Sequence, residues 1–515
     1  AKDRKKAPNL VTADLAQELK PELPVDSVTS AGPYLNFFIN KSLLAEVVLK
    51  KKQNLPKRKE RVMVEHSNAN THKEAHIGHL RNMALGDALA RIMRAAGFPT
   101  VNAYYINDTG AHVAKCLWAL QAYHFDEAPG ENKLQWLGSM YREGAQKAAA
   151  DDEAKQAADS VLQRLEAGDK KLTSLWRKTR QWSLDDWHRI FEQLEMLPFD
   201  AQFYDSEVSK HVKSIVDEMH SKGVLKESDG ALIADLEAER LNTAIIRKSD
   251  GTTPYLTKDL ALAAEKFNEY DIERSVYVVG SEQELHFQQL FKLLEKNGFA
   301  QAKKCYHLSY GLVMLASGKM SSREGTAILF DDLYNDVFAQ ATKEVASRHE
   351  DWDKKKREQA AKAITLAAMK FPMVLQEPNK RIVFDVAKAV DFEGETGPYL
   401  QYTSARLSSI LRKHGKKVSD NVDCAKLATA EEQALIKLMS RENDVVTEAA
   451  EKYRPATVAR YALDVSQAAN RYYHAHPILK APAQEKKARL LLVLKARELL
   501  GRVVELLGLP VLEEM

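Results

Sequence analysis

Three histidines lie close together in the stretch THKEAHIGHLRN, residues 71–82. His72 and His76 have the spacing of two imidazoles on one face of a zinc-binding helix. However, they precede Gly78, where the chain should still be turning into a helix, and no further ligand has a suitable spacing. A second interpretation is an anion site, in which imidazoles and backbone N–H groups at a helix N-terminus donate to phosphate oxygens. A third is that these are polar histidines at an exposed helix start. The setting favours the anion site.

The elements around this stretch support a nucleotide-binding turn. The residues RVMVE at 61–65 are typical of a short strand, and apolar positions from 85 to 96 follow helical spacing until Gly97. The stretch VNAYYIND at 101–108 predicts a second strand. Strand, helix and strand in this order form a βαβ unit, which implies parallel pairing and a ligand site at the carboxyl ends of the strands.

The remaining chain divides into regions of different pattern. Residues 1–50 predict a small mixed unit, with a helix in LVTADLAQEL and a strand at 32–40, followed by a basic linker. Strand–helix patterns return at 274–298 and 311–322, whereas the region from about 341 onward is almost entirely helical. We therefore predict an α/β fold with three domains, at 1–57, 58–385 and 386–515, and a helical insertion at about 120–240.

Composition narrows the class of protein. Apolar residues make up 45% and charged residues 29%, as in a globular protein, and no apolar run reaches the roughly 20 residues that cross a bilayer. The net charge of +3 is small, but basic clusters at 50–61, 353–358, 411–418 and 485–490 either attract phosphate backbones or are solvated helix ends. The N-terminus lacks the apolar stretch of a signal peptide, and the three cysteines are widely separated. We expect a cytoplasmic protein without a membrane partner.

Two short motifs carry a resemblance to a known family. HIGH at 76–79 and KMSSREG at 319–325 resemble the two signatures of class I aminoacyl-tRNA synthetases. The flanking stretches are similar to arginyl-tRNA synthetases, and the resemblance extends from about residue 30 to 515. The stretches are VEHSNANTHKEAHIGHLRN, YYINDTGAHVAK, PYLTKDLALAAEKF, YVVGSEQELHFQQ, ETGPYLQYTSARLSSI, NRYYHAHPIL and the C-terminal LGLPVLEEM.

The resemblance implies a fold, a reaction and partners. The fold would be a Rossmann-like parallel-sheet catalytic domain with a helical insertion, a small N-terminal α+β domain that contacts tRNA, and an all-α C-terminal anticodon-binding bundle. The N-terminal domain is shorter than is usual in the family, so we expect it to be truncated. The reaction would join L-arginine to tRNA(Arg), with ATP converted to AMP and pyrophosphate. Mg²⁺ is expected with ATP, structural zinc is not, and the protein would be a monomer. Family members usually need bound tRNA before they activate arginine.

The resemblance also assigns ATP-binding residues. His76 and His79 would contact the phosphates and stabilise developing charge, which in-line displacement at phosphorus requires. Lys319 would approach the phosphates from the second signature. That signature has Ser322 where the family usually has a second lysine, so Lys73 is expected to supply the missing positive charge as a catalytic cation. The remaining implied ATP contacts are Gly78, His286, Ser321 and Ser322.

Binding of a guanidinium needs carboxylates that can accept its hydrogen bonds. The resemblance implies that Tyr255 and Asp259 hold the guanidinium, with Glu65 nearby. It implies that Asn70 and Gln283 take the α-amino and α-carboxylate groups, helped by Asn68. Single-stranded anticodon bases are recognised by stacking and by hydrogen bonds. The candidate anticodon contacts in the C-terminal region are Tyr402, Arg406, Tyr472, Tyr473 and Met515.

Two other interpretations remain open from the sequence. One is a synthetase of the same class with another amino-acid specificity, although the scattered cysteines do not resemble a zinc-binding cysteine enzyme of this class. The other is a non-catalytic RNA-binding paralogue, favoured only by Ser322 and opposed by the intact His76, His79 and Lys319.

Overall fold

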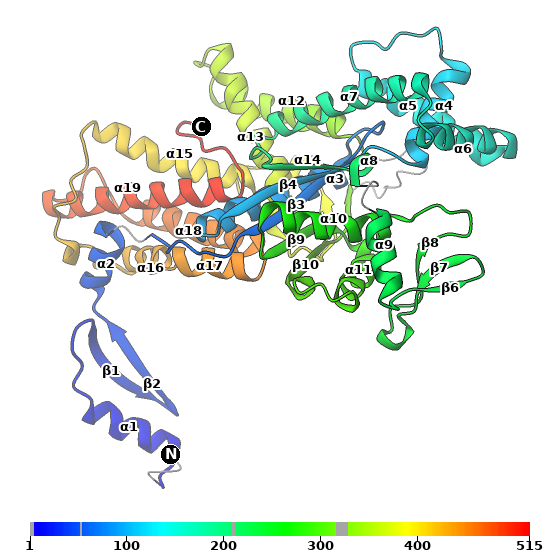
Figure 1. Ribbon diagram of the computed structural model, residues 1–515. Helices are drawn as coiled ribbons and strands as arrows, with labels where there is room; N and C mark the ends of the chain where they lie inside the picture. The colour runs from blue at the N-terminus through cyan, green and yellow to red at the C-terminus, as the bar shows by residue number, and fades with distance from the viewer. Residues whose placement is uncertain (1–4, 52–53, 209–211, 316–327) are drawn as a thin grey trace.

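The computed structural model describes residues 5–51, 54–208, 212–315 and 328–515. Its centre is a five-stranded parallel sheet in the order β10-β9-β3-β4-β5 (Figure 1). This arrangement confirms the α/β fold class. The strands are β3 (Val62–Asn70), β4 (Thr100–Asn107), β5 (Ala201–Tyr204), β9 (Arg274–Gly280) and β10 (Cys305–Tyr310).

Helices cover both faces of this sheet, because β3 sends alternate side chains to opposite sides. Val62 and Val64 join the core beneath α3 (Ile77–Ala95), while Met63 joins a second core beneath α10 (Tyr255–Tyr270) and α11 (Glu284–Lys296). Glu65, two positions after Met63, therefore lies on the same side of the sheet as Met63, under α10. This alternation places a carboxylate against a helix that also carries charged residues.

The region expected as a helical insertion has a more varied structure. Four helices follow β4, namely α4 (Ala111–Tyr123), α5 (Lys133–Ala150), α6 (Asp152–Glu166) and α7 (Lys170–Gln193). The chain then returns to the central sheet as β5, a strand too short and too irregular in pattern to stand out in the sequence. After α8 (Asp205–Val208) and α9 (Val212–Ser221) comes a small antiparallel sheet of β6 (Lys226–Ser228), β7 (Ala231–Ala234) and β8 (Ala244–Arg247).

The C-terminal region is mainly helical, as expected. One short strand, β12 (Ile382–Phe384), pairs in parallel with β11 (Val313–Leu315). The helices are α12 (Phe330–Arg348), α13 (Lys354–Leu375), α14 (Val386–Ala389), α15 (Gly397–His414), α16 (Ala430–Met439), α17 (Glu442–Glu451), α18 (Pro455–Ala475) and α19 (Ala483–Leu506).

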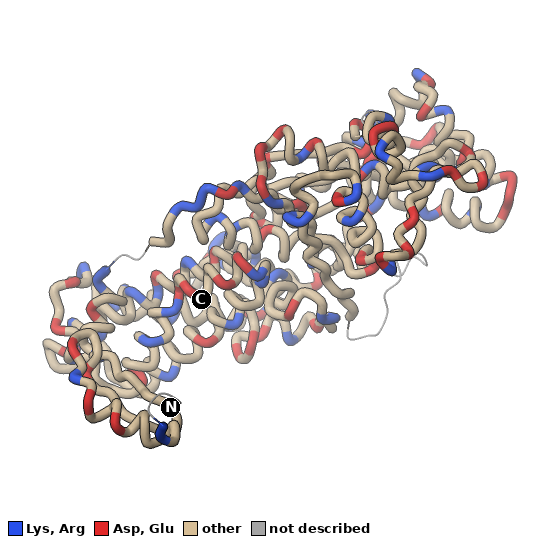
Figure 2. The backbone as a smooth tube through the Cα atoms, turned by 60° about the horizontal axis from the view of Figure 1, so that its bottom comes forward, with Lys and Arg blue, Asp and Glu red and all other residues tan. Residues whose placement is uncertain are grey.

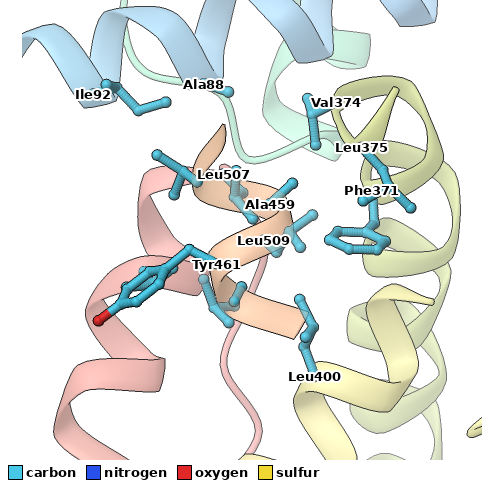
Figure 3. Packing of buried hydrophobic residues seen from close by; sticks show 14 of the residues in the cluster. Ala88, Ile92, Phe371, Val374, Leu375, Leu400, Ala459, Tyr461, Leu507 and Leu509 are labelled. Carbon is cyan, nitrogen blue, oxygen red and sulfur yellow. The ribbon is translucent and has the colours of Figure 1, made fainter. Parts of the chain in front are cut away.

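One hydrophobic core runs from the sheet into this helical region. Figure 3 shows Ala88 and Ile92 of α3 facing Leu507, with Phe371 of α13 and Leu400 of α15 nearby. Because α3 begins at the HIGH stretch, the same helix connects the candidate site to the C-terminal helices.

The N-terminal unit projects from the body of the molecule (Figure 1). It contains α1 (Pro8–Glu18) and an antiparallel pair of β1 (Val25–Ala31) and β2 (Tyr34–Ile39), of which the sequence predicted only the second strand. Then α2 (Lys41–Lys50) returns to the helical region, where Lys50 donates to the Val422 carbonyl at 3.0 Å.

Charges of both signs are distributed along the tube in Figure 2, as the small net charge of +3 requires. Among the residues that the structure describes, no helix combines the length and the apolar character needed to cross a membrane.

Candidate active site

The carboxyl end of β3 has an irregular backbone. Ser67 and Asn68 have positive φ angles of 71° and 28°, and the register with β4 shifts between His66 and Ala69. Asn82 of α3 stabilises this irregularity, because its Oδ1 accepts the Ser67 N–H at 2.6 Å and its Nδ2 donates to the Val278 carbonyl at 2.8 Å. Backbone of this kind is costly and is common at functional sites.

Two of the three histidines cap α3 with their imidazoles. His76 is the N-cap, and its Nδ1 accepts the Gly78 N–H at 3.1 Å. The Nδ1 of His79 accepts the His76 N–H at 3.1 Å, and the two rings lie 3.8 Å apart. An Nδ1 that accepts from a backbone N–H carries no proton, so each neutral ring keeps its proton on Nε2. The sequence therefore provides two fixed donors at a helix N-terminus.

Electrostatics keep both rings neutral. Burial and the positive charge of Lys73 together lower the pKa of His76 to about 4. Burial, His76 and Lys73 together hold the pKa of His79 well below its ordinary value. Lys73 itself lies 4.4 Å above the ring of Tyr141 in α5. The expected catalytic cation is thus close enough to act electrostatically on both histidines.

His72 has a different place. Its Nε2 contacts Thr179 Oγ1 at 2.8 Å, and its N–H donates to Ser183 Oγ at 3.0 Å, both on α7. The side chain is fully buried, and burial lowers its pKa to about 3. His72 therefore attaches the turn to the helical insertion. His72 and His76 therefore have different partners, because the Nδ1 of His76 accepts from the start of α3. They do not form the pair of zinc ligands that their spacing allowed.

The second signature at 319–325 lies outside the described residues, and this includes Lys319, Ser321 and Ser322. The residues that follow it are bonded to the first signature. Ile77 N–H donates to the Ile328 carbonyl at 3.1 Å, and Phe330 N–H donates to the Ala75 carbonyl at 2.9 Å. Residues 328–330 are therefore adjacent in space to the start of the first signature.

Amide side chains line the neighbouring strand ends. Asn107 Nδ2 donates to Asn70 Oδ1 at 3.1 Å, and Asn68 Nδ2 reaches the Val278 carbonyl at 3.4 Å. Among the described residues, Asn68 Oδ1 and Asn107 Oδ1 are buried without a hydrogen-bond partner. Polar atoms left in this state are expensive, and a ligand with donor groups would satisfy them. Asn107 was missed in the sequence, where it read only as part of a strand-end turn.

The expected guanidinium contacts come from one helix. Tyr255 begins α10 and is about half exposed, with its hydroxyl over Gly110, where a Cβ would lie 3.1 Å from it. Asp259 lies one turn later, and its Oδ2 contacts His286 Nε2 at 2.6 Å. His286, expected beside the adenosine, thus contacts the arginine candidate, while Gln283 is exposed at the end of β9.

Glu65 is buried under this helix and forms an ion pair with Lys266 of α10. Burial raises the pKa of Glu65, and the positive charge of Lys266 opposes that rise. Asp259 is close enough for its negative charge to raise the same pKa. Sequence reasoning missed Lys266. Its only signal was its position seven residues after Asp259, which places both on one helical face.

The candidate anticodon residues gather on α15 and α18. Arg406 donates to Tyr402 Oη at 2.7 Å and to Asn470 Oδ1 at 2.8 Å, and its guanidinium lies 5.0 Å from the Tyr473 ring. Beside them is an open cavity of about 610 Å³. It is lined by Tyr399, Glu431, Gln467, Asn470, Arg471 and His474, with Ala475 at its end.

The remaining two anticodon candidates, Tyr472 and Met515, have different surroundings in the structure. Tyr472 is fully buried in the main core, so the expectation that it contacts tRNA was wrong for this side chain. Met515 packs with Tyr402 and Trp352 in a small cluster and is partly exposed.

Comparison with known proteins agrees with this arrangement. Residues 40–386 match the family model of tRNA synthetases class I (R), catalytic domain, and residues 400–515 match the DALR anticodon binding domain. The arginine–tRNA ligase of Bdellovibrio bacteriovorus is 35% identical over all of this chain and 90% of its own length. That of Clostridioides difficile is 34% identical, with 100% and 92% covered.

A solved structure gives the same result. The Thermus thermophilus arginyl-tRNA synthetase superimposes with a TM-score of 0.86 at 29% identity, covering 100% of this chain and 93% of the other. The match extends over the sheet, the insertion and the helical region together. The chain therefore belongs to the class I arginyl-tRNA synthetase family.

Proposed function

We propose that this chain is an arginine–tRNA ligase, which activates L-arginine with ATP and transfers it to the 3′ end of tRNA(Arg). The observation that carries the proposal is the edge of the sheet itself. Two neutral imidazoles that carry their proton on Nε2 cap α3 beside Lys73. Two carboxylates lie nearby, Glu65 on β3 and Asp259 on α10. The imidazoles at the start of α3 can donate to phosphate oxygens, and the two carboxylates can accept hydrogen bonds from a guanidinium.

In the first step, the arginine carboxylate oxygen attacks the α-phosphorus of ATP, and pyrophosphate leaves. The chain's contribution is positioning and neutralisation of charge, because this chemistry needs no covalent nucleophile. We assign His76 and His79 as Nε2–H donors to the phosphate oxygens and Lys73 as the nearby cation. Gly78 leaves room beside them. Mg²⁺ would enter with the nucleotide as part of the substrate.

Residues around β3 and α10 would hold the amino acid. We assign Asp259, Tyr255 and Glu65 to the guanidinium, and Asn70 and its neighbours to the α-substituents. Asn68, Gln283 and Asn107 are the candidates for those neighbours. The buried, unpartnered amide oxygens at Asn68 and Asn107 support an α-ammonium contact, because an ammonium group donates hydrogen bonds without accepting any.

The transfer step requires that the tRNA reach both ends of the molecule. The 3′ end must enter the sheet edge, and the anticodon would contact the helical region near Tyr402, Arg406 and Tyr473, with Met515 beside them. The cavity on α18 supports this assignment, because it offers space next to an Arg–Tyr cluster that can stack on bases. We further propose that the protein acts as a cytoplasmic monomer.

The decisive test is arginine-dependent exchange between ATP and pyrophosphate, with and without tRNA(Arg), using each other amino acid as a control. Exchange with arginine alone among the amino acids supports the proposal, and a requirement for tRNA would reproduce the family trait. His79→Ala should reduce the rate about 100-fold or more through loss of a fixed donor. His188→Ala, an exposed histidine of α7, is the matched control and should have no effect. No exchange under any condition would contradict the proposal.

A further inference from the structure

Lys266 is a fully buried lysine directly beneath the candidate arginine site. It lies on the same face of α10 as Asp259, and its Nζ forms an ion pair with Glu65 on β3. Lys266 lies within the stretch PYLTKDLALAAEKF, but the family resemblance assigned it no role. A buried ammonium is costly unless it is paired, so its place here requires an explanation.

Two aromatic rings lie beside the Lys266 side chain. Its Nζ lies 4.5 Å from the ring centroid of Tyr277 on β9 and 5.5 Å from that of Phe203 on β5. Aromatic faces attract a cation, and they offer nothing comparable to a neutral amine. Lys266 therefore has Glu65 as its ion-pair partner and two aromatic faces beside it.

The surroundings of Glu65 disfavour its ionised form. Desolvation raises its pKa most, and the nearby Asp259 carboxylate adds to the rise. Other titratable groups face this cluster. The hydroxyls of Tyr105 on β4 and Tyr277 on β9 and the thiol of Cys305 on β10 are neutral near pH 7. Asp259 contacts the His286 ring at 2.6 Å, and Asp205 beside Tyr105 is paired with Lys258 at 2.5 Å. Within the described residues, Lys266 is the cation named at Glu65.

We propose that Lys266 is a positioning residue that keeps Glu65 ionised beneath the amino-acid site, so that arginine binds without release of a proton. The inference rests on the proposed function, because it takes arginine as the ligand. With Lys266 in place, Glu65 offers a second carboxylate beside Asp259 that can accept hydrogen bonds from a guanidinium.

Removal of Lys266 should change the proton balance of binding. In Lys266→Met, Glu65 loses its cation and takes up a proton, which arginine must displace when its guanidinium arrives. Calorimetric titration of the full-length protein with L-arginine, in two buffers of different ionisation enthalpy, counts that proton. We expect none released by the wild type and close to one by the variant at pH 7. Arginine affinity in the variant should fall about tenfold or more and recover as the pH rises.

Two further variants separate this role from a merely structural one. Lys266→Arg keeps the charge and should restore wild-type proton balance. The double variant Glu65→Gln with Lys266→Met has no carboxyl to titrate, so it should bind arginine weakly and release no proton. Lys266→Gln replaces the methionine variant if that protein does not fold, with the same proton release expected. Lys370→Met is the matched control, because Lys370 is also fully buried and paired with a carboxylate, but on the opposite, α3 face of the central sheet.

The outcomes distinguish the inference from the proposed function. If the wild type binds no arginine, alone or with tRNA(Arg) added, the proposed function fails. If the wild type binds arginine but already releases a proton, Glu65 is protonated beforehand and the inference is overturned. If Lys266→Met weakens binding equally at every pH without proton release, the inference is also overturned, and Lys266 only supports the packing.

Discussion

Two buried lysine–carboxylate pairs in this molecule have opposite surroundings. Lys266 and Glu65 lie beneath the candidate amino-acid site, between α10 and β3. Lys370 and Asp87 connect α13 to α3, where the catalytic sheet meets the C-terminal helices, and both side chains are fully buried. Each pair consists of a buried lysine and a buried carboxylate. The two pairs differ in the other groups that each carboxylate contacts.

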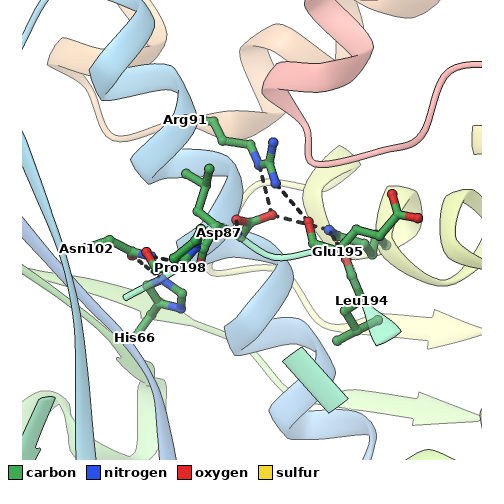
Figure 4. Close-up of polar contacts among 9 residues, drawn as sticks. His66, Asp87, Arg91, Asn102, Leu194, Glu195 and Pro198 are labelled. Atoms are coloured by element: carbon green, nitrogen blue, oxygen red, sulfur yellow. Dashed lines mark hydrogen bonds and ion pairs between the residues drawn. The ribbon is translucent and has the colours of Figure 1, made fainter. Parts of the chain in front are cut away.

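Asp87 is surrounded by donors. Lys370 Nζ lies 3.2 Å from its Oδ2, Arg91 Nε lies 3.1 Å from the same oxygen, and the Leu197 N–H donates to Oδ1 at 2.9 Å. Figure 4 shows Arg91 and the backbone of Leu194 and Glu195 around this carboxylate. Burial alone would raise the pKa of Asp87, but these donors together hold it below its ordinary value.

Glu65 has fewer compensating contacts, and its pKa is raised. A carboxylate whose hydrogen bonds are complete contributes to the fold and offers nothing to a ligand. One that is paired with a single lysine keeps accepting capacity for a guanidinium. The comparison indicates that the completeness of the donor set, more than burial, separates a structural pair from a binding one.

The largest effect we expect is on stability at the structural pair. Lys370→Met leaves Asp87 buried with one cation fewer and should lower the free energy of unfolding by about 3–5 kcal/mol. Denaturant unfolding followed by fluorescence measures it. Arginine affinity should stay within about twofold of the wild type, as unlinked sites do. A large change in arginine affinity in Lys370→Met would contradict the view that the Lys370–Asp87 pair serves only the fold.

Glu65→Gln should give the reverse result. Its amide keeps the shape but loses the charge that a guanidinium needs, so KM for arginine should rise about 10- to 100-fold. Aminoacylation at varied arginine concentration measures this, with KM for ATP as the internal control. An unchanged KM for arginine would show that Glu65 serves only Lys266.

A smaller effect is expected at Arg91, the more accessible cation of the structural pair. Its side chain is 22% exposed, and Lys370 remains when it is removed. Arg91→Met should therefore cost only about 1 kcal/mol in unfolding free energy. A loss as large as that of Lys370→Met would mean that the two cations contribute equally.

The smallest effect we expect is a dependence of the free energy of unfolding on pH in the acid range. Because the folded-state pKa of Asp87 is depressed, its contribution to stability is present above its ordinary value of 3.8 and is lost as the pH falls through the lower folded value. Stability curves of the wild type and Asp87→Asn should therefore converge in this acid range. Curves that stay parallel there would contradict the assigned direction of the pKa.

Local pattern was sufficient to predict the parts of the fold that depend on neighbouring residues. The β3–α3–β4 unit follows from apolar spacing, and the HIGH stretch lies at the helix start, where the sequence placed it. β1 was missed because its residues VDSVTSA are mostly polar and exposed, and β5 because it has only four residues. The site residues remain predictions, although the structure brings Glu65, Asp259 and His286 close to one another.

What the sequence could not provide was the choice of partners across long separations. Lys266 meets Glu65, and Lys370 meets Asp87, only after the sheet and helices have formed. His72 similarly looks like a ligand beside His76 until α7 is in place, when Thr179 and Ser183 take its hydrogen bonds. Such contacts depend on tertiary packing, which single-sequence periodicity does not encode.

The capping of α3 by His76 and His79 has a consequence for the working range of the protein. Since both Nδ1 atoms are occupied by backbone N–H groups and the pKa of His76 is about 4, neither ring changes charge between mildly acidic and mildly alkaline conditions. The helix start offers the same two uncharged donors throughout that interval. Acidification of the surroundings by one or two pH units would leave this part of the molecule chemically constant, although histidine is the side chain most often associated with a response to such a change.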